Sequence, residues 1–469
     1  MRLNPVGGLA VLATSVVAGA GAVLYVSLTD GKALLVAALP LILALLLLLV
    51  VDKRMLFFLI LLFRASSDPL FESSKFAGGI GVGGLINALI MLIALVFVLE
   101  RPSKLDRRVI SIWAPMLLAA LVAAAHSPVM QDAARSFLGL LSYAAVFVIA
   151  FYIVRSRADF EKSVNVILLS SLIPTAYAFV DIARHGALPG FRLQSTFTHP
   201  NILAFYLVLN ISLLFHRLKT AQTDVPSVRQ SYPRWLLIAY MMLLLGLLLL
   251  TQTRGAWAGC LAVFAIYGLL FERRYLLYLA AVLLLALLIP SVRDRLLDLG
   301  SGNQYTQYAK LNSFAWRQLL WKTGLQWMDN AHVAFGYGLD AFKHYSPVFF
   351  PLSGGVRWGA HSTFVQWYFE TGVVGVLCSA WMYIRLFFTL LLGMKTDRVG
   401  TLIVIILLVE YLFFAFSDNM LDYLAFNWYY WFFIGAACAL SMLRHANRVA
   451  ETELALDGKA AGRERIHAT

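Results

Sequence analysis

The sequence contains little charge, which excludes most soluble folds. Charged residues make up 13% of the chain and hydrophobic residues 61%, whereas soluble domains carry about 25% charged residues. Disordered chains are polar and rich in charge, so disorder is excluded as well. Apolar runs of about 17 to 25 residues recur along the chain, and each can cross a bilayer core. The composition predicts an all-α polytopic membrane protein, since a β-barrel would show alternating segments of about ten residues.

Cysteine is also scarce, and the sequence motifs of several cofactors are missing. The three cysteines, Cys260, Cys378 and Cys438, all fall inside apolar runs, where a thiol behaves as a small hydrophobic side chain. Neither a disulfide framework nor a metal cluster is therefore expected. Glycine-rich nucleotide loops and the HExxH and Ser-His-Asp patterns are absent from the sequence. We expect no metal, no cofactor and no use of ATP.

Basic residues outnumber acidic ones, and their positions predict an orientation in the membrane. The formal net charge of +13 could indicate nucleic-acid binding, but membrane proteins accumulate Lys and Arg in their cytoplasmic loops. If the amino terminus is cytoplasmic, 24 of the 38 Lys and Arg residues fall in cytoplasmic loops and the tail, and seven fall in short external loops. This asymmetry favours cytoplasmic termini and no nucleic-acid partner.

Fourteen apolar segments are candidates for membrane spans, although the third is short. We interpret the first as a retained span, since it is long for a signal peptide and lacks a clear cleavage site. About 12 to 14 transmembrane helices are expected, in a bundle over 1–290 and 361–443 that is followed by a cytoplasmic tail over 444–469. The candidate spans are 6–28, 33–51, 54–64, 80–99, 109–125, 135–154, 163–182, 199–215, 234–250, 256–271, 275–290, 361–391, 399–416 and 424–443.

Residues 291–360 form a predicted extramembrane unit between the two parts of the bundle. The segment is about 70 residues long, whereas connections usually have 4 to 6 residues. Trp316, Leu320 and Trp327 occur at helical spacing and are followed by a glycine-rich stretch over 335–340. The pattern predicts an amphipathic helix and then a turn. A basic amphipathic helix beside a bilayer tends to contact membrane lipids.

Two arginines on predicted external loops are candidates for anion binding. Arg192 precedes a span that begins at Pro200, and the first turn of a helix offers free N–H groups to an anion. The alternative is an ordinary interfacial arginine that reaches toward lipid head groups. Arg254 lies in a very short connection, before Gly255, which permits close approach of a ligand. An external positive charge opposes the positive-inside bias, so a functional role is favoured for Arg254.

Two further external segments contain titratable side chains. His361 opens the span that follows Arg357, and a histidine suits the role of a general base near neutral pH. Glu370 lies about 13 Å further along a continuous helix, where we favour a structural role. Asp418 and Asp422 could bind a divalent metal, pair with an arginine or orient His361. Arginines beside a histidine above a hydrophobic bundle favour a lipid-linked phosphate or pyrophosphate as substrate.

The order and spacing of these segments resemble the O-antigen ligase and O-antigen polymerase superfamily. The segments are Phe197–Asn201, Thr251–Ala256, Phe335–Phe342, and His361 with Glu370–Gly372. The resemblance extends over about residues 190 to 375. Members commonly have Asn after the histidine, where this chain has Ser362. The resemblance implies a membrane glycosyltransferase fold of the C type (GT-C) and, for the ligases, a reaction without metal or ATP.

The resemblance also implies roles for individual residues. Arg192 and Arg254 would hold the pyrophosphate of an undecaprenyl-linked glycan, and His361 would deprotonate the attacking sugar hydroxyl. Asp418 resembles an acidic residue in the last external loop of the family, and it is a candidate catalytic residue beside His361. The reaction would be a direct displacement at the anomeric carbon, with inversion and a pyrophosphate leaving group. Further candidates for substrate binding are Arg357, His199 and Asn201.

Three functions remain open. A ligase would transfer O-antigen from undecaprenyl pyrophosphate to lipid A-core, a polymerase would join lipid-linked repeat units, and a non-enzymatic protein would transport a lipid or glycan. A glycan-to-protein ligase is less favoured, because the chain has no added folded carboxy-terminal domain. The transporter is disfavoured because the predicted spans contain no Lys or Arg at mid-depth. The large external segment resembles the ligase branch, which would act in the bacterial inner membrane with its active site facing the periplasm.

Overall fold

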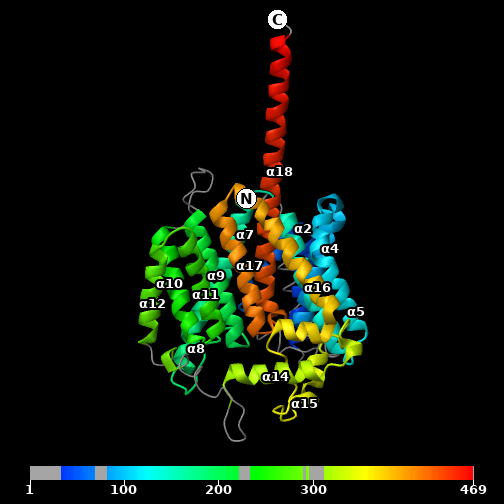
Figure 1. Cartoon of the computed structure of the whole chain (residues 1–469), viewed down its shortest axis with the longest axis vertical. Helices are drawn as coiled ribbons and strands as arrows, with labels where there is room; N and C mark the ends of the chain where they lie inside the picture. Colours follow the sequence, from blue (N-terminus) through cyan, green and yellow to red (C-terminus); the bar gives the residue numbers. More distant parts are fainter. Residues whose placement is uncertain (1–32, 69–81, 221–232, 289–291, 295–310, 468–469) are drawn as a thin grey trace. The chain divides into compact units, whose positions relative to one another are not determined.

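The computed structural model describes residues 33–68, 82–220, 233–288, 292–294 and 311–467. Within these residues the helices follow one another along the chain from blue to red in Figure 1. The first predicted span, 6–28, lies outside the described residues. The chain forms two compact units, Met1–Leu62 and Phe63–Thr469, which are described separately below.

The helix α2 (Ala33–Arg64) contains most of the described part of the first unit. Two spans were predicted here, and the helix is broken at Asp52, which has non-helical backbone angles. The Asp52 carboxylate accepts hydrogen bonds from the backbone N–H groups of Arg54 and Met55, at 3.1 and 3.0 Å. Asp52 therefore caps the start of the second helical segment, as expected of an Asp at an N-cap.

The second unit is an all-α bundle of apolar helices, which confirms the predicted fold class of a polytopic helical membrane protein. In the described part of the chain, seven helical segments are long and apolar enough to cross a membrane, and three more apolar helices are shorter. The long ones are α4 (Val82–Glu100), α5 (Arg107–Ala125), α6 (Met130–Ile153), α7 (Arg157–Ser170) continued by α8 (Leu172–His185), α9 (Pro200–Thr220), α16 (Thr363–Leu391) and α17 (Arg398–Ser417). The shorter ones are α10 (Arg234–Leu250), α11 (Arg254–Leu270) and α12 (Arg274–Leu287).

Two boundaries differ from the prediction. The span predicted over 163–182 is two helices, α7 and α8, which meet at Ser171. The Ser171 hydroxyl bonds the carbonyl of Leu168 and the hydroxyl of Tyr240, so side-chain hydrogen bonding competes with the helical ladder there. The last helix, α18 (Leu424–His467), continues beyond the predicted span into the polar tail. Figure 1 shows this extension leaving the bundle as a single helix.

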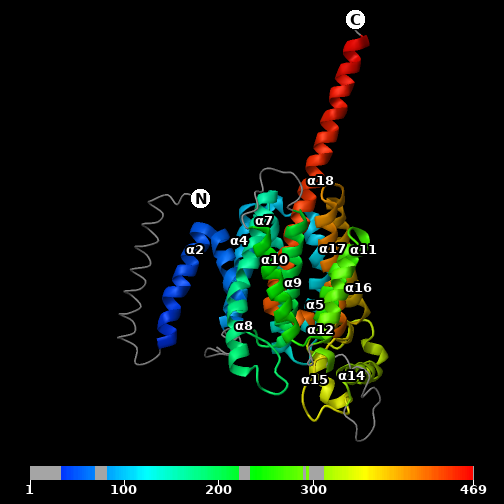
Figure 2. The ribbon, with the colours of Figure 1, turned by 90° about the vertical axis from the view of Figure 1, so that its left-hand side faces the viewer.

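The centre of the second unit is α9, in which every residue from Asn201 to Thr220 is buried. It contacts α7, α10, α11, α17 and α18, while α6 packs along α18 and α5 packs along α16. The helices α14 (Ser313–Trp327) and α15 (Ala341–Phe349) lie at one end of this bundle, and both views place them there (Figures 1 and 2). We call this the loop end. The α18 extension leaves from the opposite end.

Candidate functional site

The helix α16 is interrupted at its loop end, and the interruption positions His361. Gly372 adopts φ 63° and ψ −166°, which separates a short segment over 363–371 from the long helix that follows. The segment before α15 fills the gap with backbone hydrogen bonds, Tyr337 N–H to Phe369 O at 3.0 Å and Val373 N–H to Val333 O at 2.9 Å. Glu370 was predicted about 13 Å along a continuous helix. It lies near the end of the short segment, two residues before the break at Gly372.

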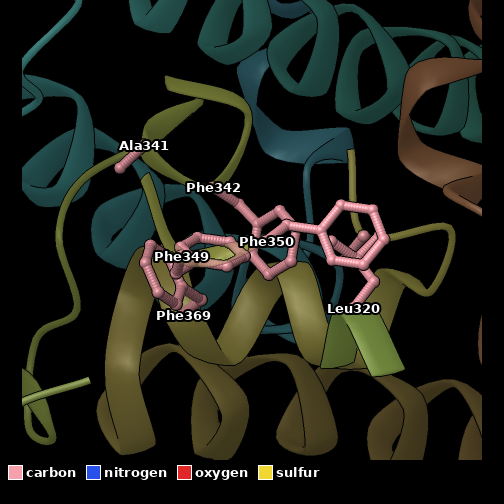
Figure 3. Close-up of a cluster of buried hydrophobic side chains, with 7 residues drawn as sticks. Leu320, Ala341, Phe342, Phe349, Phe350 and Phe369 are labelled. Atoms are coloured by element: carbon pink, nitrogen blue, oxygen red, sulfur yellow. The ribbon is translucent and has the colours of Figure 1, made fainter. Parts of the chain in front are cut away.

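An aromatic cluster holds the short segment of α16 against α14 and α15. Figure 3 shows its buried side chains between these elements. The amphipathic helix predicted around Trp316 is α14, and its residues Trp316, Leu320 and Trp327 all pack in this cluster. A Cβ on Gly324 of α14 would lie 3.0 Å from the Phe342 ring, so the absence of a side chain permits close packing there. The buried members are Leu320, Ala341, Phe342, Phe349, Phe350, Ala360 and Phe369.

His361 follows this cluster directly and has a strained backbone. Its φ of 49° is in the left-handed region, which costs a non-glycine residue about 1 to 2 kcal/mol. The imidazole is half-buried and lies against the Trp316 ring, with 5.8 Å between the ring centroids. The residues after it are fixed to the loop after α17, since Ser362 N–H donates to Asn419 Oδ1 at 2.9 Å and Thr363 N–H to Asp418 O at 3.1 Å. Strain that is held in place in this way is common at functional sites.

Ser362 has a structural role. It stands where the family that the sequence resembles commonly has asparagine. It is the N-cap of α16, and its hydroxyl accepts the backbone N–H of Val365 at 3.5 Å. Serine is among the residues preferred at this position.

Asp418 is the centre of a buried polar network. Its Oδ2 accepts a hydrogen bond from Asn201 Nδ2 at 2.5 Å, and its Oδ1 accepts from the Tyr423 hydroxyl at 2.5 Å. Asp418 is buried, with only 3% of the residue exposed to solvent. Burial raises the pKa of Tyr423 well above its ordinary value, so this hydroxyl remains a donor. The network links the start of α9 to the loop that fixes Ser362 and Thr363.

Arg192 and Arg254 lie on the two segments that approach this network. Arg192 Nη2 donates to Asn201 Oδ1 at 2.8 Å and to Thr253 Oγ1 at 3.0 Å, and its Nε donates to Thr251 O at 3.0 Å. Arg254 is the first residue of α11 and is half-buried. A Cβ on the adjacent Gly255 would lie 3.2 Å from the Ser417 hydroxyl, so this turn approaches the loop that carries Asp418. The structure thus brings the segments of both arginines to the Asp418 loop.

His199 and His361 share the same electrostatic surroundings. The His199 Nδ1 accepts the backbone N–H of Asn201 at 3.1 Å, which leaves the proton of a neutral ring on Nε2. Burial lowers the pKa of both imidazoles, while the negative charge of Asp418 raises it and the positive charge of Arg317 lowers it. Both rings are therefore favoured as neutral bases near pH 7, with a carboxylate nearby to stabilise a proton taken up.

The structure adds residues that the sequence did not single out. Arg317 lies on α14, is half-buried, and has no hydrogen bond or ion pair with the described part of the chain. Its charge acts on His199 and on His361, and the neighbouring Trp316 lies against the His361 ring. The only sequence signal was a basic residue beside Trp316 on an amphipathic helix, and this does not identify a site. Tyr423 was also missed, since a tyrosine after an external loop carries no motif.

Arg357 and Asp422 are placed apart from the arginines of the Asp418 network. Arg357 is exposed and lines a cavity together with Lys343 of α15. Asp422 does not share partners with Asp418, because its carboxylate pairs with Lys343 Nζ at 3.0 Å. Among the described residues, no group of three or more His, Cys, Asp or Glu side chains could hold a metal ion.

Comparison with known families finds one match, in the middle of the chain. The model of the O-antigen ligase family matches residues 239–380. This part of the chain is similar to the O-antigen ligase family. The match covers α10 to α15 and most of α16, and it includes Arg254, Arg317 and His361 but neither Arg192 nor Asp418. The chain has no match among curated proteins.

Proposed function

We propose that the chain is an O-antigen ligase of the bacterial inner membrane, with a GT-C-type fold and its active site at the loop end, facing the periplasm. The donor would be a glycan linked to undecaprenyl pyrophosphate, and the acceptor would be a sugar hydroxyl of lipid A-core. The match of residues 239–380 to the O-antigen ligase family supports a membrane enzyme that acts on lipid-linked glycans. The observation that carries the proposal is the network of Arg192, Asn201 and Asp418 beside the strained His361.

His361 is the proposed general base. Its neutral imidazole takes the proton of the acceptor hydroxyl as that oxygen attacks the anomeric carbon of the donor sugar. A new carbon–oxygen bond forms while the bond from the anomeric carbon to the pyrophosphate oxygen breaks, with inversion. The proton remains on the imidazole, and the nearby charge of Asp418 stabilises the imidazolium. Asp418 is in this scheme a positioning residue, since it also fixes the backbone at Thr363.

The arginines are the proposed binding site for the leaving group. The pyrophosphate gains negative charge as the bond breaks, so cations already fixed in place stabilise the transition state more than the ground state. Arg192 is fixed by three hydrogen bonds to Thr251, Thr253 and Asn201. Arg254 and Arg317 approach the same region from α11 and α14. His199 and Asn201 hold the start of α9 beside them.

The decisive test is transfer by the purified protein in lipid nanodiscs. Undecaprenyl-pyrophosphate glycan is supplied with lipid A-core and without added metal or nucleotide, and both lipids are followed by gel mobility. We expect a glycan ladder on lipid A-core with the wild type, and a loss of about 10² to 10⁴ in rate with His361→Ala. Donor binding by His361→Ala should be unchanged. Full transfer by this variant would remove the assignment of His361 as the base.

The same assay separates the alternatives. A polymerase would lengthen the donor chain without lipid A-core, because its acceptor is a second lipid-linked glycan. A transporter would bind the donor tightly and give no product on either lipid. Arg254→Ala should weaken donor binding, and unchanged binding would remove the phosphate assignment.

A further inference from the structure

A second polar cavity lies at the loop end, apart from the proposed donor arginines. Its volume is about 310 Å³, at the lower end of the size range of small-molecule pockets. None of Arg192, Arg254 and Arg317 lines it. Its walls come from the start of α6, from α15 and from the loop after α15, and the side chains that matter below are Arg135, Ser136, Asp340, Lys343, His344 and Arg357.

The acidic groups around this cavity already have partners. Asp340 accepts a hydrogen bond from Ser136 and lies 3.5 Å from Lys343 Nζ. Lys343 also pairs with Asp422 at 3.0 Å. Asp132, on the same wall, pairs with Arg135 at 3.1 Å. These pairs leave little negative charge free to bind a cation.

Two groups that can donate hydrogen bonds are not used by the described part of the protein. Arg357 makes no ion pair or hydrogen bond there, although its guanidinium carries five donor N–H groups. The buried Nδ1 of His344 likewise has no hydrogen-bond partner. A planar guanidinium suits bidentate binding of a carboxylate or phosphate. The cavity is therefore complementary to a ligand with an anionic group and additional hydroxyls.

Lys343, on the cavity wall, lies near the segment that precedes His361. A Cβ on Gly359, two residues before His361, would lie 3.4 Å from Lys343 Cε and 2.5 Å from Asn419 Nδ2. Asp422, the partner of Lys343, also acts electrostatically on the His361 ring. The cavity wall at Lys343 is therefore close to the segment that leads to His361, on a side of this segment that the proposed donor arginines do not line.

We infer that this cavity is the acceptor subsite, and that Arg357 and His344 bind a carboxylate or phosphate ester on a sugar next to the one that is glycosylated. The inference rests on the proposed function, since it assigns the acceptor side of the same transfer reaction. It makes Arg357 a determinant of acceptor choice, separate from the arginines that hold the donor.

The test measures transfer by full-length protein in nanodiscs, at saturating lipid-linked donor and varied acceptor. Three acceptors are used: intact lipid A-core, the same lipid with its phosphate esters removed, and the same lipid with its carboxylates reduced. Arg357→Ala should raise the KM for intact acceptor about 10- to 100-fold, the size expected for loss of a charge-assisted hydrogen bond. Its kcat and donor KM should remain close to those of the wild type. Arg357→Lys should recover part of the effect, and Arg184→Ala, an exposed arginine outside the cavity, is the matched control.

The two modified acceptors identify the anionic group and can overturn the inference. For the acceptor that lacks the recognised group, wild type and Arg357→Ala should have the same KM. An equal KM increase for all three acceptors, or an increase in donor KM alone, would refute recognition of an acceptor anion by Arg357. Equilibrium binding of intact lipid A-core, measured without donor, keeps this result separate from the proposed function. If the wild type transfers nothing yet binds the core, and Arg357→Ala loses that binding, the proposed reaction fails while the subsite stands.

Discussion

Replacement of Asp418 separates its structural role from its electrostatic role. Asp418→Ala removes the acceptor of two side-chain donors, Asn201 Nδ2 and the half-buried Tyr423 hydroxyl, and of the Asn419 N–H. Each orphaned side-chain donor costs about 1 to 3 kcal/mol, so the free energy of unfolding should fall by about 2 to 6 kcal/mol. Asp418→Asn keeps an oxygen for Asn201 and offers an N–H to the Tyr423 oxygen. It should therefore lose far less stability than Asp418→Ala.

The same pair of variants tests the electrostatic role on the activity of the enzyme. Burial lowers the pKa of His361 and the charge of Asp418 raises it. A base is active when unprotonated, so the acid limb of kcat/KM for acceptor should reflect a histidine titrating below its ordinary value. Asp418→Asn removes the raising influence, and the acid limb should move to lower pH. Its kcat should also fall, because the imidazolium that forms during transfer loses its stabilising charge.

Thermal unfolding in one detergent and pH–rate profiles in nanodiscs provide the two readouts. Glu451→Gln, which changes an exposed carboxylate on the α18 extension, is the control for loss of one charge. The reasoning is refuted if Asp418→Asn and Asp418→Ala unfold at the same temperature, or if the acid limb of Asp418→Asn stays in place. Persistence of the same acid limb in His361→Ala would assign that limb to another group.

Three further changes test other parts of the fold and site. Gly372→Ala places a Cβ 2.3 Å from the backbone carbonyl oxygen of Ala334, at a residue with a positive φ. We therefore expect the free energy of unfolding to fall by several kcal/mol and transfer to be lost. Thermal unfolding and the gel assay measure the two effects. Arg317→Ala should raise the donor KM at least tenfold with Arg317→Lys intermediate, and an unchanged donor KM would exclude it from the donor site. Burial raises the pKa of Glu272, but hydrogen bonds from Lys219, Tyr267 and Arg274 outweigh this effect and lower the pKa to about 2. The stabilising effect of ionised Glu272 is present above its unfolded-state pKa near 4.5 and is lost as the pH falls through about 2. Glu272→Gln should therefore lower the melting temperature equally at pH 7 and pH 5. A decrease confined to pH 7 would contradict this.

The bundle was predictable from the sequence because bilayer crossing imposes a strong constraint on composition. Apolar runs such as 398–417 are long and carry few charges, and a helix follows because backbone groups in lipid must bond within their own segment. The signal resolves an interruption only where charged residues mark it. The charged residues 52–54 separate the predicted spans 33–51 and 54–64, and the helix breaks at Asp52. Ser171, where α7 meets α8, does not interrupt the hydropathy of the run predicted over 163–182.

The candidate site was predictable only in part, for a similar reason. Arg192, Arg254 and His361 stand out because charged or titratable side chains are rare beside apolar runs. Arg317 does not stand out, since it lies in a polar segment where arginine is ordinary. Its charge acts on His361 because α14 packs on α15 and on the short segment of α16, which places Trp316 against the His361 ring. That contact joins residues that are distant in sequence, and no local pattern encodes it.

The position of His361 depends on two independent supports. One is the aromatic cluster of α14 and α15, which lies within the segment matched by the family model. The other is the hydrogen bonding of Ser362 and Thr363 to the loop around Asp418, which lies outside it. Since Asp418 in turn binds Asn201 and Asn201 binds Arg192, the proposed base and the proposed pyrophosphate site share one buried network. A change at Asn201 should therefore affect donor binding and the pH profile together, which no change confined to the aromatic cluster would do.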